Sequence, residues 1–552
     1  MALFVVLFML ASHLFAAFPA EVESRILHMT HKGQIEEALA CYLEHTGFEN
    51  EHDFALLQSI GETILLRGTA SSDPEVQQLC LFGAGIAQSP HFIPILEKGV
   101  KSEDMKNQLI SLNFLSKYLD DTADYLLIDA LGSPFLMARL EACYQLALKK
   151  NPIVVDHLMA LYLKVPPVVR IFFPQIMICI DNQMANQTMQ HYLADQDMLV
   201  RTQALLSIAK AKRDDFLPQV RTMAEHAHFV QQEAAALCLG EMHDRSSLSI
   251  LQKMSTSKQE EVRLTALVAL YKIGEKSAVD PLVEEARKKN LFAIRALAGI
   301  EEKASKEILY ELVGDKNRDV ALNASLALLQ QKDPACVSVI IELLTNPDIG
   351  FTATPTPAGS IVPWKVVASA KQKDKKLLGL LAKSDLLRHQ ILMSMIELPQ
   401  KDFLEIARAI FEKQDHTQIP LVVELLANHR TAETMDLLKE MQQKAGAPFI
   451  RNYCNLALYK LGERGPYEEK LIEWIEKNED SMLIQLQEKK AQERQTQFTL
   501  SAEENSRFFI EALEALLIRQ SEKGVETLIH TIAYGNPKNR YALAGLLIRT
   551  TE

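Results

Sequence analysis

The sequence predicts an all-α protein built as an array of antiparallel helix pairs, and three observations support this fold class. Gly and Pro number 21 each in 552 residues, well below the average share of roughly 12%, which argues against a turn-rich β protein. Hydrophobic residues make up 48% of the chain but aromatic residues only 7%, so the apolar content is mainly aliphatic and favours helices. The third observation is an internal repeat, because an array can grow to this length without enlarging a single core.

The repeat is a short motif in which an aliphatic residue, often followed by Arg, precedes a small residue by four positions. Clear copies begin at Val200 and at Val262, each with Arg next and Ala at the fourth position. Successive copies start 26 to 33 residues apart. Their first residues are Val76, Met105, Ala138, Val169, Val200, Val230, Val262, Ile294 and Val320. After an interruption the motif returns at Leu387, Ile419 and Ile450.

Within one copy the apolar residues follow a helical period. Val262, Ala266 and Leu270 share one helix face, and Gly274 can end that helix. A second helix follows, with Pro281 in its first turn. Each unit is therefore a pair of antiparallel helices, and since one pair cannot bury its own apolar face, neighbouring pairs must stack.

The motif and its period resemble the HEAT-repeat family, specifically its short repeats of about 30 residues, over residues 71–462. The resemblance implies a right-handed α-solenoid whose concave surface binds other proteins. The family's turn aspartate before the motif is present as Asp73 and Asp197 and is absent from most copies.

The first twenty residues carry no charged side chain and resemble a secretory signal peptide or an N-terminal anchor. We therefore predict export to the bacterial periplasm or cell envelope. No Lys or Arg precedes the apolar run, so a buried first helix in a cytoplasmic assembly scaffold is the alternative. No later segment reaches 18 apolar residues without a charge, so no other membrane span is expected.

The rest of the chain is predicted to divide according to the repeat. The expected regions are an N-terminal helical cap (21–70), a repeat array (71–349), a Pro-rich insertion loop (350–365), further repeats (366–481) and a C-terminal helical region and cap (482–552). The run of residues around Trp364 is expected to form a short strand or hairpin. The insertion as a whole is interpreted either as a connection between repeats that binds nothing or as a projecting binding loop. Apolar-faced helices at 508–518 and 525–533 are expected to close the chain.

The sequence offers no catalytic motif, so we expect a non-enzymatic protein without a cofactor. It contains no GxSxG, P-loop, HExxH or GxGxxG pattern, and no His-Glu pair of the kind carried by HEAT-like metal-dependent hydroxylases. No residue in the sequence supports a lyase-like activity, which is also known for HEAT-like repeats. The histidines at 28, 31, 226 and 228 are interpreted as surface residues rather than metal ligands. A net charge of −12 argues against nucleic-acid binding.

The seven cysteines are expected to be buried thiols, because they lie far apart in apolar helix patterns. Arginines recur at one repeat position and would form a stripe in a regular array. One interpretation is hydrogen bonding and ion pairing between repeats, and the other is a surface that binds an acidic protein partner. The candidate partner-binding residues are Arg139, Arg170, Arg201, Arg263, Arg295 and Trp364, with Arg388 and Arg451 at the same repeat position.

Overall fold

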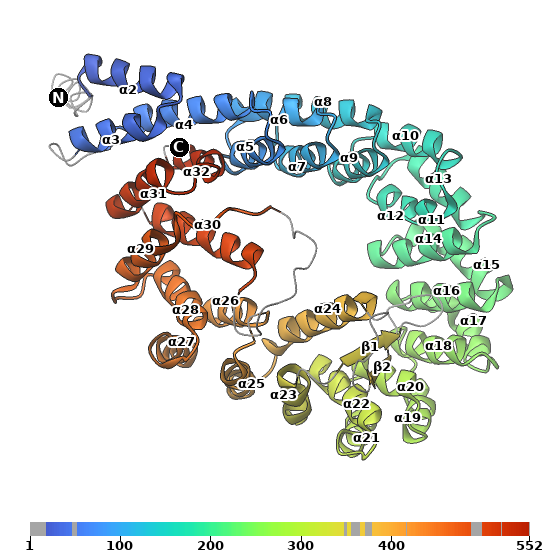
Figure 1. Cartoon of the computed structure of the whole chain (residues 1–552). Coiled ribbons are helices and arrows are strands. Elements are labelled where there is room, and N and C mark those ends of the chain that lie inside the picture. Colours follow the sequence, from blue (N-terminus) through green and yellow to red (C-terminus); the bar gives the residue numbers. More distant parts are fainter. Residues whose placement is uncertain are drawn as a thin grey trace, which may run out of the picture. The chain divides into compact units, whose positions relative to one another are not determined.

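The chain forms two compact units in the computed structural model (Figure 1). Unit 1 comprises Met1–Leu146 together with Leu438–Glu552, and unit 2 comprises Ala147–Leu437. The structure describes residues 18–46, 52–346, 350–354, 365–369, 378–415, 417–486, 500–519 and 521–550.

Unit 1 consists of helices from both ends of the chain. Those from the N-terminal part are α2 (Ala20–Lys32), α3 (Ile35–Thr46), α4 (Phe54–Gly68), α5 (Pro74–Ile86), η1 (Pro90–Phe92), α6 (Ile93–Val100), α7 (Met105–Leu115), α8 (Asp121–Asp129), η2 (Ala130–Gly132) and α9 (Leu136–Leu148), whose last two residues belong to unit 2. Those from the C-terminal part are α27 (Ala432–Lys444), which begins in unit 2, α28 (Pro448–Leu461), α29 (Tyr467–Asn478), α30 (Ala502–Ile518), α31 (Glu522–Tyr534) and α32 (Asn539–Arg549).

Unit 2 consists of helix pairs and one pair of strands. Its elements up to the centre of the chain are α10 (Ile153–Tyr162), α11 (Pro167–Arg170), α12 (Phe173–Met177), α13 (Gln183–Leu193), α14 (Met198–Ala211), η3 (Asp214–Phe216), α15 (Leu217–His226), α16 (Phe229–Glu241), η4 (Arg245–Ser247), α17 (Leu248–Met254), α18 (Glu260–Lys272) and η5 (Lys276–Ala278). The remaining elements are α19 (Val279–Arg287), α20 (Leu291–Ala296), η6 (Leu297–Gly299), α21 (Lys303–Val313), α22 (Arg318–Gln330), η7 (Pro334–Cys336), α23 (Val337–Thr345), β1 (Gly350–Thr354), β2 (Lys365–Ser369), α24 (Leu378–Met395), α25 (Gln400–Lys413) and α26 (Ile419–His429).

The helix pair predicted around Val262 is present. The motif lies on α18, where Val262, Ala266 and Leu270 are all buried. Gly274 adopts a φ of +108°, a left-handed conformation that a residue with a Cβ rarely takes, and the chain then reverses into α19. The predicted alternation of helix, glycine turn and returning helix is therefore confirmed for this copy.

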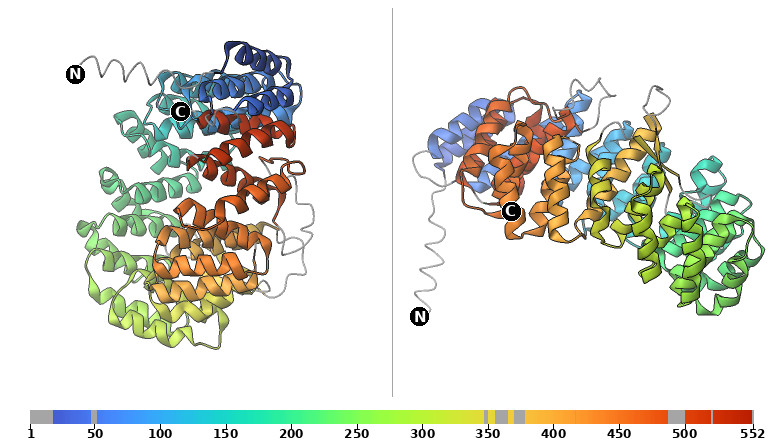
Figure 2. Two further views of the ribbon diagram at one scale, coloured as in Figure 1. Left: turned by 90° about the vertical axis from the view of Figure 1, so that its left-hand side faces the viewer. Right: turned by 90° about the horizontal axis from the view of Figure 1, so that it is seen from below.

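Successive motif helices, defined here as those that carry the repeated motif, pack side by side in unit 2. In the run α14, α16 and α18 they pack more extensively than the companion helices α15 and α17 between them. Small residues allow this approach: a Cβ on Gly240 would lie only 2.9 Å from the Cα of Ala269. The closer row lies on the inside of the curve in this part of unit 2 (Figure 1), and the pairs stack in successive layers (Figure 2). The described chain is thus solenoid-like; the right-handed superhelix stays a prediction.

One motif copy is displaced from its predicted register. Met105 was expected to be the aliphatic first residue of its copy, but it is the first residue of α7 and is exposed. Gln108 and Leu112 are buried instead. Asp104 caps this helix, its side chain accepting from the Lys106 amide at 2.7 Å, and the buried positions start at Asn107, two residues after Met105.

The copy at Val169 is broken into two short helices, α11 and α12. Pro174 lies in the first turn of α12 and has no amide proton, so it cannot donate to the carbonyl of Arg170 four residues earlier. The chain turns at Ile171 and Phe172, and the ring of Phe172 is exposed. Phe173, which the motif placed at its small position, is fully buried.

The described part of the chain is all-α except for one hairpin-like pair of strands in the insertion. Strands β1 and β2 pair antiparallel, with Gly350 opposite Ser369 and Thr354 opposite Lys365. Strand β2 packs on α20 and α22 within unit 2. The strand predicted near this position is therefore confirmed, whereas Trp364 lies outside the described residues. So do residues 1–17, which hold most of the signal-peptide-like segment.

In unit 1, helices from the two ends of the chain pack together. The predicted closing helices correspond to α30 and α31, and a third helix, α32, lies against α4 and α5 (Figure 1). Its contact with α5 is a crossing of two glycines: a Cβ on Gly545 would lie 2.0 Å from the carbonyl oxygen of Gly83. At the first turn of this pair Lys538 Nζ is 2.8 Å from Asp73 and 2.6 Å from Glu75.

Candidate protein-binding surface

The repeated arginines hydrogen-bond mainly within the array. Arg201, Arg263 and Arg451 each donate from Nη1 to the carbonyl six residues earlier, in the turn before the motif helix. The distances are 3.1 Å for Arg263 and 2.5 Å for Arg451. Arg201 also bonds to Gln231 of the next repeat. In the amide orientation that satisfies both side chains, the side-chain oxygen of Gln231 accepts from Nε of Arg201 at 2.5 Å.

Two further arginines of this set differ in their surroundings. Arg170 donates to the Val165 carbonyl at 3.3 Å and its guanidinium lies 4.9 Å from the ring centre of Tyr162. For Arg295, neither Nε nor Nη1 has a hydrogen-bond partner among the described residues. Burial lowers the pKa of Arg295 to about 10, because desolvation penalises the charged form.

These contacts show how the arginines can stabilise the turns of the array. Arg201, Arg263 and Arg451 bond to the turn before their own helix, and of the bonds described for them only that from Arg201 to Gln231 joins two successive motif helices. Arg139 is half-buried, like the others. That the set also binds an acidic partner stays a prediction, and it includes Trp364, which the structure does not describe.

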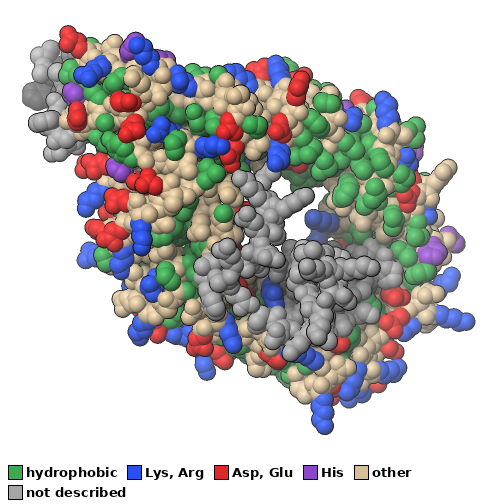
Figure 3. All heavy atoms as spheres, in the orientation of Figure 1, with side chains coloured by type: hydrophobic (Ala, Val, Ile, Leu, Met, Phe, Trp, Pro, Cys, Tyr) green, Lys and Arg blue, Asp and Glu red, His purple; other side chains and the backbone are tan. Residues whose placement is uncertain are grey.

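An apolar surface lies on α11, α12 and α14. Val168 is 67% exposed, Phe172 49% and Leu199 54%. These three residues are called the apolar patch below. In the space-filling view, hydrophobic side chains gather over α11 and α12 and the neighbouring α10 (Figure 3), where Met159 and Leu163 are also exposed. Single exposed apolar residues are common, whereas a group of them indicates an interaction surface.

A hydrogen bond joins the two motif helices beside the patch. Gln175 on α12 donates from Nε2 to Oε1 of Gln203 on α14 at 3.1 Å. Gln203 follows Leu199 by four residues and lies on the same face of α14, whereas Phe172 lies in the turn just before α12.

Acidic and basic groups occur together at both edges of this face. At the C-terminal end of α14, Lys210 and Lys212 are exposed, and Arg213 next to them pairs with Asp181 and Asp215. At the N-terminal end, Asp195 accepts from the hydroxyl of Tyr162, on which Arg170 stacks.

The sequence contains a signal for this patch that the motif analysis did not use. In four consecutive copies the residue before the first aliphatic position is apolar: Met137, Val168, Leu199 and Phe229. At the same position three other copies carry an acid, namely Glu75, Glu261 and Asp319, whereas Ala293, Leu386 and Phe449 are apolar. The four copies named first differ from the rest in being consecutive.

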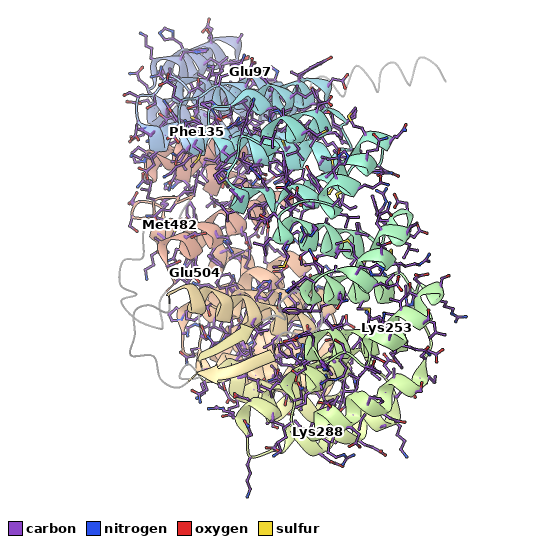
Figure 4. The ribbon with its side chains drawn as sticks, turned by 90° about the vertical axis from the view of Figure 1, so that its right-hand side faces the viewer. Glu97, Phe135, Lys253, Lys288, Met482 and Glu504 are labelled. Carbon is purple, nitrogen blue, oxygen red and sulfur yellow. The ribbon has the colours of Figure 1, made fainter. Side chains whose placement is uncertain are left out.

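The described residues hold little sign of other chemistry. No group of three or more His, Cys, Asp or Glu side chains in them could hold a metal ion, and no helix among them is long and apolar enough to cross a membrane. As predicted, six cysteines are buried, and Cys179 is half-buried; none is in a disulfide. Among the companion helices of unit 2, Lys253 lies at the end of α17 and Lys288 just after α19 (Figure 4).

The helix-pair repeat, its motif and its spacing agree with a comparison to known protein families. The model of HEAT repeats matches residues 223–291, from the last turn of α15 to the start of α20. Residues 223–291 are therefore similar to HEAT repeats. The predicted resemblance is thereby confirmed for this region, and the HEAT-repeat region adjoins α14, one of the helices that carry the apolar patch.

Comparison with whole proteins adds little. No curated protein matches the chain in sequence. Among solved structures, the YibA protein of Escherichia coli is 15% identical, with 60% of this chain and 98% of that chain covered and a TM-score of 0.25. UNC-45 from Drosophila melanogaster is 13% identical, with 96% and 82% covered and a TM-score of 0.30. TM-scores this low leave both structures without bearing on the function of this chain.

Proposed function

We propose that this chain is a non-enzymatic scaffold that binds another protein on the motif-helix row of unit 2. The observation that carries the proposal is the apolar patch, in which Val168, Phe172 and Leu199 expose about half or more of their surface. Stacked helix pairs present extended surfaces that are suited to binding another polypeptide. A HEAT-repeat region next to the patch supports the same function.

The test is a double substitution in the full-length chain, Phe172→Asp with Leu199→Asp. Fully burying a Phe or Leu side chain contributes about 1.5–3 kcal/mol, and these two are already about half buried, so losing both should weaken binding by at least about 10-fold. Met393→Asp is the matched control, because Met393 is another exposed apolar residue of unit 2, on α24. Tagged protein would be isolated from its own cells after mild cross-linking, and the co-purifying proteins quantified. A partner retained by the double variant would contradict the proposal.

We further propose that the protein acts in the bacterial periplasm or cell envelope. The support is the uncharged apolar segment at the start of the sequence, which resembles a signal peptide. The intact mass of the protein from its native host tests this. Loss of roughly 17–20 residues is expected for an exported protein, whereas the full mass would favour the alternative, a cytoplasmic assembly scaffold.

A further inference from the structure

We infer that the apolar leader, residues 1–17, is removed by hydrolysis of the Ala17–Phe18 peptide bond, so that the mature protein begins at Phe18. One water molecule is consumed, and the products are a carboxylate on Ala17 and an α-ammonium group on Phe18. This inference rests on the proposed export, because a signal peptidase acts on a chain only when it is exported. It goes beyond export because it assigns the processing site, and the packing of the residues that follow the leader carries it.

The sequence alone does not choose the cleaved bond. A signal peptidase site has small residues before the cleaved bond, in an A-x-A-like pattern. The bonds after Ala17 and after Ala20 both follow an alanine, and both have Phe at the third position before the bond, namely Phe15 and Phe18. The choice between the two bonds therefore depends on which residues the folded domain uses.

The ring of Phe18 is part of the core of unit 1. It is 8% exposed and stacks on Tyr42 of α3, with the ring centres 5.0 Å apart and an angle of 12° between the planes. The ring of His45, also on α3, lies 6.2 Å from it. Tyr42 is fully buried, and its hydroxyl accepts from the amide of Asp53, the N-cap of α4. Cleavage after Ala20 would remove the Phe18 ring and uncover the face of Tyr42 on which it stacks.

The start of α2 also needs the residue after Phe18. Pro19 is the N-cap of α2, and its carbonyl accepts from two amides of the first turn, at 2.7 and 3.0 Å. Cleavage after Ala20 would remove this cap and place an ammonium group on Glu21, where the N-terminal end of the helix dipole disfavours a positive charge. Cleavage after Ala17 keeps the cap and leaves the ammonium group two residues before the helix. Of the two candidate products, only the chain that begins at Phe18 can form all of these contacts.

The test is the N-terminal sequence and the intact mass of the protein purified from its native host. We expect the chain to begin at Phe18 and to have the mass of residues 18–552. In Ala17→Leu no product that begins at Phe18 should form, because a large residue directly before the bond does not fit a signal peptidase site. Ala20→Leu is the matched control: Ala20 is exposed, so this variant should be processed like the natural chain.

Other outcomes would overturn the inference in distinguishable ways. A processed chain that begins at Glu21, or at any residue other than Phe18, would contradict the assigned bond and leave the proposed export intact. The full mass in the membrane fraction would mean an uncleaved anchor, and the full mass in the cytosol would contradict the export as well. The packing has its own measurement in the full-length chain: hydrogen exchange of α3 should be at least about tenfold faster in Phe18→Ala. It should be unchanged in Leu66→Ala, an exposed position of α4, and equal exchange in the two variants would overturn the inference.

Discussion

The crossing of α32 on α5 makes the strongest prediction about stability. Replacing Gly545 by Ala would place a Cβ 2.0 Å from the carbonyl oxygen of Gly83 and 2.7 Å from its Cα. Ordinary contacts of a Cβ are 3.4–4 Å long. The obstructing atoms belong to the backbone of α5, so no side chain can rotate away, and the two helices must separate by more than about 1 Å.

The loss of stability expected for Gly545→Ala is the difference between two opposing effects. Overpacking a tight contact costs about 1–3 kcal/mol, and Ala in place of a helical Gly returns about 1 kcal/mol of helix propensity. Gly545→Ala should therefore weaken the attachment of α32 by up to about 2 kcal/mol. Gly545→Leu cannot be accommodated, and it should release the burial of Leu543, Leu547 and Ile548, about 5–9 kcal/mol at 1.5–3 kcal/mol for each side chain.

Hydrogen exchange measured by mass spectrometry is the appropriate assay. A chain with two compact units has no single unfolding free energy, whereas exchange reports the opening of each segment. For Gly545→Ala, amides of α32 (539–549) and of the facing helices α4 and α5 (54–86) should exchange up to about 30-fold faster. The control is Gly314→Ala, because a Cβ at Gly314 meets nothing within 4 Å and its φ is −92°.

One result would refute this reasoning. If Gly545→Ala slowed the exchange of α32, the glycine would behave as it does in an exposed helix, where Ala stabilises by about 1 kcal/mol. The packing of α32 on α5 would then not exist in solution.

Three further predictions concern ionisable groups. The hydrogen bond from Lys538, and then that from the Glu75 amide, hold the pKa of Asp73 below its usual range. The stability that the Asp73–Lys538 pair adds is therefore complete above about pH 4 and is lost as the pH falls through the lowered pKa. Hydrogen exchange of α32 should become faster in that range, and the increase should be smaller in Lys538→Met. Arg295→Leu should be neutral or stabilising, because Nε and Nη1 have no described partner, whereas Arg201→Leu should cost about 1–3 kcal/mol as carbonyls lose their donor; hydrogen exchange of the helices that carry the two residues compares them. In the native protein a thiol reagent should modify Cys179 first, because the other six thiols are buried. Peptide mapping would identify the modified site. Rapid labelling of several cysteines would contradict the burial of those six thiols.

The local structure of the array was predictable from the sequence because each signal acts over a few residues. Buried aliphatics at helical spacing placed the helix at Val262, and Gly274 marked its end, since both follow from backbone geometry. The copy at Met105 shows the limit of this reasoning. An aliphatic residue near the N-terminus of a helix can lie on its open face, and the cap at Asp104 determines where the buried positions begin.

The attachment of α32 could not be predicted in the same way. Its sequence, rich in Ala, Leu and Gly, is that of a buried helix, but nothing within it identifies the surface that it covers. Gly83 lies within a helical copy of the motif, and the sequence shows no sign that its neighbour is Gly545, more than 400 residues later. Long-range contacts of this kind depend on the path of the whole chain.

The attachment of α32 also bears on how binding should be measured. The first motif helix of a repeat array has no preceding repeat and would expose the flank that its successors bury, which is why such arrays need caps. Here α32 covers α5, and Gly83 on α5 meets the backbone of α32 at Tyr541 and Gly545. A chain shortened before residue 539 would expose the apolar flank of α5. That flank could bind other proteins non-specifically, independently of Phe172 and Leu199. Loss of binding on substitution of those two residues is therefore informative only in a chain that retains α32.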